Sequence, residues 1–275
     1  MIRVFPRRTK WIPRDDLAFV GEPTFFLPPE QPVYISVTFT WDIEEGERLQ
    51  QSWAQYYPDV RIGGPAFNDS GGEFEPGRFI KEGVTITSRG CIRNCDFCYV
   101  PGREGKIREL EIKDGWIVED NNLLACSQKH IECVFEMLSR QPERINFAGG
   151  FDVRLFKPWH VQLLKLVKLG MIWFAYDQPN QWDSLNRVAN LLAYLPQQKK
   201  RCYLLCGRNG DTMLEAEKRL EAVFNLGMDP FAMLYRGDKD QRYNREWSTF
   251  LKKWTRPAAF RSAMRDKALV DREVK

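Results

Sequence analysis

Three of the seven cysteines fall within one stretch of eight residues, at Cys91, Cys95 and Cys98. Their spacing is C-x3-C-x2-C, and they closely follow residues 84–87, where alternating apolar and polar side chains indicate the end of a strand. Three thiolates on one loop can hold one metal centre. Because a [4Fe-4S] cluster has four irons, three cysteines leave one iron without a protein ligand, open to bind and activate a small molecule.

A structural zinc site is the first alternative. Tetrahedral zinc requires a fourth cysteine or histidine at a matching spacing. None lies near the three cysteines: the histidines are His130 and His160, and the other cysteines are Cys126, Cys133, Cys202 and Cys206. We therefore favour an iron–sulfur cluster with an open iron over zinc or a purely structural cluster.

The spacing, with the aromatic Phe97 directly before the third cysteine, resembles the radical S-adenosylmethionine (SAM) superfamily. The Ser-Arg-Gly at residues 88–90 resembles the cobalamin-type and methylthiotransferase-type branches of that superfamily. The resemblance covers residues 81–240. It implies that Cys91, Cys95 and Cys98 bind a [4Fe-4S] cluster, and that the amino and carboxylate groups of SAM chelate the fourth iron.

The same resemblance implies a reaction. A reduced cluster passes an electron to SAM, which splits into methionine and a 5'-deoxyadenosyl radical, and the radical takes a hydrogen atom from a substrate that the sequence does not identify. The electron would come from a flavodoxin- or ferredoxin-like partner. Two alternatives stay open: an iron–sulfur binding or electron-transfer protein that never cleaves SAM, and a radical SAM enzyme that modifies nucleic acid.

Further cofactor contacts are expected at the carboxyl ends of the predicted strands, where function gathers in parallel α/β folds. By resemblance, Phe97 lies against the adenine of SAM. Asp120, Asn121 and Asn122 follow the second predicted strand, where the family has a Gly-Gly-Glu-like motif that contacts the SAM amino group. The alternatives are plain packing for Phe97 and capping of the following helix for the three polar residues.

Later strands add three candidates. Asp177 follows the fourth strand, where family members place a polar contact to the SAM ribose or carboxylate, and Gly207 opens a turn similar to the family's adenine-binding turn. Tyr235 ends the sixth strand and is expected to contact adenine or substrate. After the third strand, two glycines at 149–150 allow close ligand approach, and Asp152 and Arg154 are either ligand contacts or a surface ion pair.

Strand and helix signals alternate between residues 81 and 240. Strands are expected at 84–87, 116–119, 145–147, 171–176, 201–206 and 231–235, with amphipathic helices between the later ones. Apolar strands that alternate with helices indicate a parallel sheet covered by helices, so the expected fold class is α/β. The resemblance implies a partial (β/α)6 TIM-like barrel. Residues 100–115 contain three glycines, so the first helix should be short or replaced by a loop.

The two ends of the chain are expected to lie outside this core. Residues 1–80 should hold an N-terminal arm over 1–30 and a small strand–helix–strand unit, with strands at 33–41 and 60–62 and a helix at 45–57. This unit resembles a fragment of the domain that precedes the core in cobalamin-dependent members, but residues 1–80 contain no histidine for the cobalamin-ligating Asp-x-His-x-x-Gly pattern. Residues 241–275 should form one docked helix and a loose basic tail.

Composition narrows the class of protein. The chain has 275 residues, of which 43% are apolar and 28% charged, and no apolar run approaches the ~20 residues that span a bilayer. An odd number of cysteines with one tight cluster favours a reducing compartment, so the expected location is the cytoplasm.

Cys126 could donate hydrogen or bind substrate, although free cysteines are usually small buried hydrophobes. No membrane partner is expected.

Charge is concentrated at the ends of the chain. Residues 1–14 carry five basic and no acidic residues, and residues 236–275 carry twelve basic and six acidic residues. Basic ends could contact nucleic acid or another polyanion, although solvated surface is the favoured interpretation.

Overall fold

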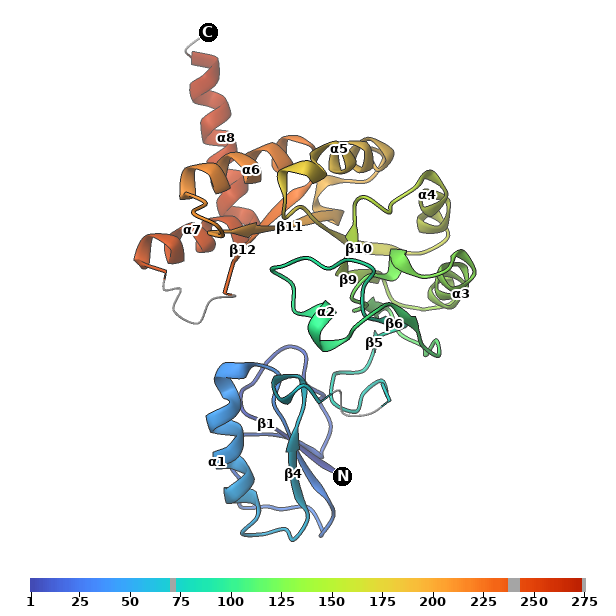
Figure 1. The fold of residues 1–275 in the computed structure, drawn as a ribbon, viewed down its shortest axis with the longest axis vertical. Coiled ribbons are helices and arrows are strands. Elements are labelled where there is room, and N and C mark those ends of the chain that lie inside the picture. Colours follow the sequence, from blue (N-terminus) through green and yellow to red (C-terminus); the bar gives the residue numbers. More distant parts are fainter. Residues whose placement is uncertain (70–72, 237–242, 274–275) are drawn as a thin grey trace. The chain divides into compact units, whose positions relative to one another are not determined.

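The computed structural model describes residues 1–69, 73–236 and 243–273, with side chains described as far as residue 267. The chain divides into two compact units. The first contains Met1–Ile86 and Lys113–Gly115, and the second contains Thr87–Ile112 and Trp116–Lys275. Figure 1 shows the course of the chain, coloured from blue at the N-terminus to red at the C-terminus.

The first unit is built on a four-stranded parallel sheet with the order β2-β1-β3-β4. The strands are β1 (Ile2–Phe5), β2 (Ala18–Val20), β3 (Val33–Ser36) and β4 (Val60–Gly63). Helix α1 (Ile43–Trp53) and two short 3-10 helices, η1 (Thr40–Asp42) and η2 (Pro65–Phe67), complete the unit. The expected strand–helix–strand order over 33–63 is present, although β3 ends five residues earlier than its pattern indicates because the chain turns into η1.

The expectation of an extended arm over residues 1–30 is wrong. β1 pairs on both sides, with β2 and β3, and all four of its residues are buried. Ile2, Val4 and Ile35 pack with Leu49 and Trp53 of α1 in the core of this unit. Four residues are too few to show a period, so the sequence alone does not distinguish this strand from an arm.

A second sheet has six strands in the order β12-β11-β10-β9-β8-β5. The strands are β5 (Val84–Thr85), β8 (Ile117–Val118), β9 (Ile145–Asp152), β10 (Leu169–Ala175), β11 (Lys200–Cys206) and β12 (Asp229–Leu234). All four pairings from β8 to β12 are parallel. The expected α/β class and the positions of all six strands are therefore confirmed. A separate antiparallel pair joins β6 (Ser88–Arg89) and β7 (Arg108–Glu109).

Helices connect the later strands of this sheet. They are α2 (Val100–Arg103), η3 (Leu123–Ala125), α3 (Gln128–Ser139), α4 (Pro158–Lys165), η4 (Pro179–Gln181), α5 (Trp182–Leu191), η5 (Gln197–Lys199) and α6 (Met213–Asn225). In Figure 1, α3 to α6 follow one another along the outer side of the strands. The short α2 confirms that no full helix follows the cysteines. Cys202, Leu204 and Cys206 of β11 are buried and alternate with less buried residues, because one face of the strand packs in the apolar core.

The C-terminal segment forms α7 (Arg245–Thr255) and α8 (Pro257–Glu273). The helix expected around residues 247–254 is present, but the expected loose tail is helical. Phe260 of α8 is 1% exposed and stacks on Trp254, and Arg261 forms an ion pair with Asp229 of β12. The mostly polar sequence of the tail gave no indication of these two contacts. No helix in the described part of the chain has the length and apolar character needed to cross a membrane.

Candidate functional site

The loop that carries the three cysteines begins on a buried carboxylate. Asp120, two residues beyond the end of β8, is 3% exposed. Its Oδ1 accepts a hydrogen bond from the Thr87 backbone N–H at 2.7 Å, and its Oδ2 accepts hydrogen bonds from the Thr87 and Ser88 hydroxyls, each at 2.7 Å. Burial raises the pKa of Asp120, and these hydrogen bonds oppose that rise. Asp120 therefore holds the two residues that open the loop.

The next two residues contact the loop itself. Asn121 Oδ1 accepts a hydrogen bond from the Gly90 N–H at 2.9 Å, and Asn122 Nδ2 donates to Cys91 Sγ at 3.3 Å. Cys91 Sγ also accepts from the Arg93 backbone N–H at 3.3 Å. Asn122 is buried, and its Oδ1 has no hydrogen-bond partner among the described residues. A buried acceptor without a partner is costly unless a ligand supplies the donor.

The predicted capping role of Asp120, Asn121 and Asn122 is wrong for α3. That helix is capped by Ser127, whose Oγ accepts a hydrogen bond from the His130 N–H at 3.2 Å. The short η3, which starts after Asn122, has no side-chain cap. The side chains of Asp120, Asn121 and Asn122 form hydrogen bonds with residues 87–91 at the start of the cysteine loop instead.

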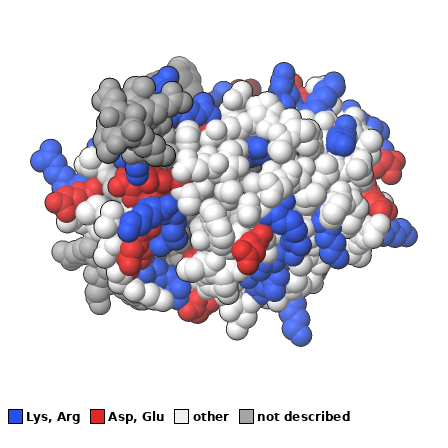
Figure 2. Space-filling model, turned by 90° about the horizontal axis from the view of Figure 1, so that it is seen from above, with Lys and Arg blue, Asp and Glu red and all other residues white. Residues whose placement is uncertain are grey.

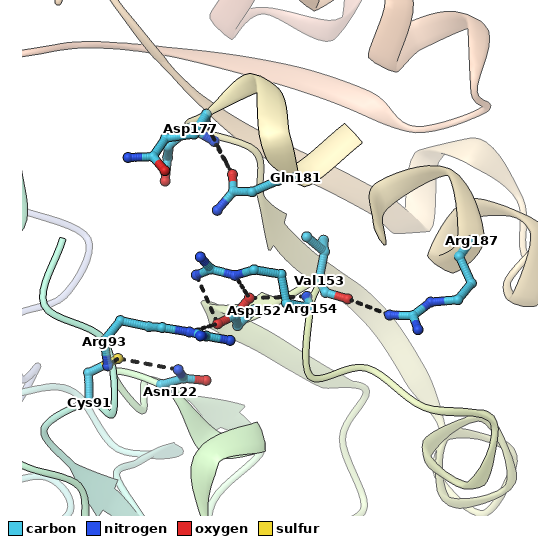
Figure 3. A network of polar contacts seen from close by, with 10 residues as sticks. Cys91, Arg93, Asn122, Asp152, Val153, Arg154, Asp177, Gln181 and Arg187 are labelled. Atoms are coloured by element: carbon cyan, nitrogen blue, oxygen red, sulfur yellow. Dashed lines mark hydrogen bonds and ion pairs between the residues drawn. The ribbon is translucent and has the colours of Figure 1, made fainter. Parts of the chain in front are cut away.

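Two arginines converge on one carboxylate at the end of β9. Arg154 donates from Nε to Asp152 Oδ1 at 2.7 Å and from Nη2 to Oδ2 at 3.0 Å, while Arg93 donates from Nε to Oδ2 at 3.0 Å. Figure 3 shows both guanidinium groups turned toward Asp152. Burial works to raise the pKa of Asp152, but the hydrogen bonds from the two arginines hold it below its ordinary value. The two guanidinium groups and the carboxylate therefore carry two positive charges and one negative charge. Because the Asp152 side chain is largely buried, solvent screens the interactions between these charges only partly.

These residues surround a cavity of about 150 Å³ at the carboxyl ends of β8, β9 and β10. All three cysteines line it. The other predicted residues on its wall are Phe97, Asn121, Asn122, Gly149, Gly150, Asp152, Arg154 and Asp177, joined by Arg93, Pro101, Ala175 and Gln181. Over the part of the chain that the structure describes, no three His, Cys, Asp or Glu side chains converge as a ready metal site. Cysteines 91, 95 and 98 share a cavity, but their sulfurs do not meet at one point.

Asp177 lies on the opposite wall of the cavity, two residues after β10. Its Oδ1 accepts a hydrogen bond from the Leu205 N–H at 3.2 Å, and its backbone N–H donates to Gln181 Oε1 at 2.8 Å (Figure 3). Burial raises the pKa of Asp177 to about 6, against smaller opposing effects of the Leu205 hydrogen bond and the Arg154 charge. Gln181 was not predicted, because it reaches the site by capping the turn at Pro179.

Gly207 and Tyr235 do not line the cavity. They lie beside Arg208, whose guanidinium carbon is 5.2 Å from the ring centroid of Phe97 and 5.7 Å from that of Tyr235. Arg208 also forms an ion pair with Asp96 of the cysteine loop. The three predicted adenine contacts are thus grouped around one arginine, which no spacing in the sequence indicated. Cys126 is outside the cavity wall, and burial raises its pKa to about 11, which leaves it a neutral thiol.

Many basic residues at the two ends of the chain are paired with acidic residues. Arg3 pairs with Asp15 and Arg7 with Asp42; Lys253 and Arg261 pair with Glu217 and Asp229. On the face drawn in Figure 2, Lys and Arg side chains are interspersed with Asp and Glu side chains and separated by wide uncharged areas. Nucleic-acid binding through the ends stays a prediction, and residues 237–242 within the C-terminal basic stretch lie outside the described residues.

Comparison with known proteins adds no assignment: no protein-family model matches the chain, and no curated protein matches it either.

Asp120→Ala is expected to lower the free energy of unfolding by about 2–4 kcal/mol, because three buried donors on Thr87 and Ser88 lose their acceptor. Urea unfolding followed by circular dichroism measures this. The matched control is Asp96→Ala, which removes a 69% exposed carboxylate from the same loop and should cost less than about 1 kcal/mol. Equal losses in the two variants would contradict the anchoring role of Asp120.

Asp177→Asn is expected to stabilise the protein at neutral pH. Between the ordinary pKa of 3.8 and the folded pKa of about 6, the folded chain holds the Asp177 proton more tightly than the unfolded chain. The stability from this group is therefore largest at low pH, falls as the pH rises through that window, and is constant above it. Above pH 6 the variant should be more stable than wild type by about 1–3 kcal/mol, with the difference vanishing at low pH.

Urea unfolding from pH 3 to 8 tests this expectation, with Asp266→Asn, on an exposed face of α8, as the control. In Asp177→Asn the side-chain amide oxygen can still accept from the Leu205 N–H, so this hydrogen bond is retained. A constant difference between Asp177→Asn and wild type across the whole pH range would show that Asp177 titrates normally.

Proposed function

We propose that the chain is a radical SAM enzyme in which Cys91, Cys95 and Cys98 bind a [4Fe-4S] cluster. The observation that carries the proposal is that all three cysteines of the C-x3-C-x2-C motif line one cavity at the carboxyl ends of parallel strands. Ligand sites of parallel α/β folds occur at this edge. The resemblance of the motif to the superfamily supplies the identity of the cluster and of SAM.

The chemistry of the donor set fits a cluster held by thiolates. One sulfur already accepts hydrogen bonds: Cys91 Sγ accepts from Asn122 Nδ2 and from the Arg93 backbone N–H. Such donors are typical of the surroundings of cluster ligands. Burial raises the pKa of Cys95 and Cys98, so as they stand these side chains are neutral thiols, and metal binding would release their protons. Cluster binding would have to bring the three sulfurs together, because among the described residues they do not form a ready metal site.

When reduced, the bound cluster would supply the electron that cleaves SAM into methionine and a 5'-deoxyadenosyl radical. The residues of the chain bind and orient SAM. We assign Asn122, whose buried Oδ1 has no partner among the described residues, to accept from the SAM ammonium group, and Phe97, on the cavity wall, to stack on the adenine. We assign Asn121 and Asp177 to polar contacts with the rest of SAM, and Gly207 and Tyr235 to the adenine side. Asp120 supports the loop instead of contacting SAM.

We infer that the six-stranded sheet, with helices along its outer side, is a partial (β/α)6 barrel whose inner side excludes water from the cavity. All seven cysteines are free, which supports a reducing compartment such as the cytoplasm. The electron donor would be a flavodoxin- or ferredoxin-like protein.

Anaerobic reconstitution with iron and sulfide, followed by dithionite reduction and assay of SAM for 5'-deoxyadenosine, tests the function. Wild type should bind about four irons and form 5'-deoxyadenosine. Cys91→Ala, Cys95→Ala and Cys98→Ala should each lose both properties. Cys133→Ala, which removes an exposed thiol from α3, is the matched control and should retain both.

Two results would overturn the proposal in different ways. Failure of wild type to bind iron would remove the cluster. Iron binding without SAM binding or cleavage would instead make the chain an iron–sulfur electron-transfer protein.

A further inference from the structure

The segment that follows the third cysteine gathers three arginines on one carboxylate. The Glu104 side chain is 7% exposed, and it forms ion pairs with Arg89 of β6 at 3.2 Å, with Arg103 of α2 at 3.4 Å and with Arg108 of β7 at 3.3 Å. Arg89 and Arg108 are direct partners across the antiparallel pair of β6 and β7. Because like charges directly opposite each other on two strands destabilise the pairing, the carboxylate between them stabilises it.

One carboxylate does not balance the basic side chains of this segment. Lys106 is exposed and has no ion pair among the described residues, so four basic side chains stand against Glu104, an excess of three positive charges. The acidic side chains on either side have other partners. Asp96 pairs with an arginine that follows β11, and Glu109 accepts a hydrogen bond from the Ser127 N–H at 2.6 Å.

Two large side chains of the same loop are exposed. Ile92 is 51% exposed and Tyr99 is 68% exposed. Tyr99 directly follows Cys98, which is itself exposed, and directly precedes α2. Exposed apolar and aromatic side chains combined with arginines are typical of surfaces that bind another protein. We call this set the basic loop surface; it consists of Ile92, Tyr99, Arg103, Lys106 and Arg108.

The place of the basic loop surface in the chain indicates what binds there. It shares one loop with Cys91, Cys95 and Cys98, so a protein bound to it lies next to the cysteines. Electron transfer between two redox groups is fastest over the shortest distance, and short-lived electron-transfer complexes need only small interfaces. The excess of positive charge favours a partner with an acidic surface and speeds its association.

We propose that the basic loop surface is the docking site of an electron-transfer protein with an acidic surface, which reduces the cluster. This inference rests on the proposed function. One electron passes from the reduced flavin or iron–sulfur centre of the partner to the cluster. The partner is thereby oxidised and the cluster reduced, and no bond forms or breaks.

The first test measures binding to the full-length reconstituted protein by isothermal titration, with an acidic flavodoxin and an acidic ferredoxin, both oxidised, as probes. At least one probe should bind at low salt, and its affinity should fall as salt is added, because salt screens exposed charges. Lys106→Glu should weaken this binding by about tenfold at low salt, and Arg108→Gln should weaken it less. Lys168→Glu is the matched control and should bind like wild type. It makes the same charge change on an exposed lysine directly before β10, at the opposite edge of the sheet.

The second test measures formation of 5'-deoxyadenosine with the reduced probe protein and, separately, with dithionite. Lys106→Glu should lose most of its rate with the probe protein and keep its rate with dithionite, a small reductant that needs no docking surface. Lys168→Glu should keep both rates.

Three results would overturn the inference while activity with dithionite leaves the proposed function standing. The first is binding that neither salt nor Lys106→Glu changes. The second is equal weakening in Lys106→Glu and Lys168→Glu, because overall charge alone would then explain the effect. The third is the absence of probe binding to wild type, including the case in which an RNA oligonucleotide binds and Lys106→Glu abolishes that binding. Absence of iron from wild type would overturn both proposals.

Discussion

One buried carboxylate determines where the cysteine loop begins. Asp120 is almost fully buried, and a carboxylate in that position is tolerated only if its oxygens are hydrogen-bonded. All three of its side-chain hydrogen bonds come from Thr87 and Ser88, the two residues that open the loop. Any shift of the loop start would leave this charge without partners. The loop is therefore fixed to the end of β8, and its remaining contacts are built from that fixed point.

The loop is then tied to three more strand ends. Besides the bond from Asn122 to Cys91 beside β8, Arg93 contacts Asp152 at the end of β9. The ion pair between Asp96 and Arg208 joins the loop to the residues after β11. Phe97 and Tyr235 share the Arg208 guanidinium, which adds the end of β12. A loop with only a four-residue helix of its own is thus held by side chains from several strands. This arrangement keeps three thiols on one cavity wall without a continuous hydrogen-bonded backbone.

Charge within the cavity follows from the same contacts. Arg93 and Arg154 carry two positive charges against the negative charge of Asp152, and Asp177, whose pKa is raised to about 6, adds a second carboxylate that is mostly ionised at neutral pH. The Arg154 charge lowers the pKa of Cys95, whereas burial and the Asp177 charge raise the pKa of both Cys95 and Cys98.

Local patterns were enough to predict the six strands of the larger sheet and the short helix after the cysteines. Such features depend on residues close together in the chain, so their signals survive in the sequence. The four-residue β1 carried no period, and the tail that forms α8 docks through Phe260 and Arg261, whose partners are distant in sequence. Only packing in the folded chain keeps Asp120 off the cavity wall and brings Phe97 and Tyr235 to Arg208. The bonds from Arg93 to Asp152 and from Arg208 to Asp96 join residues 59 and 112 positions apart, and no local pattern records which distant side chains folding brings together.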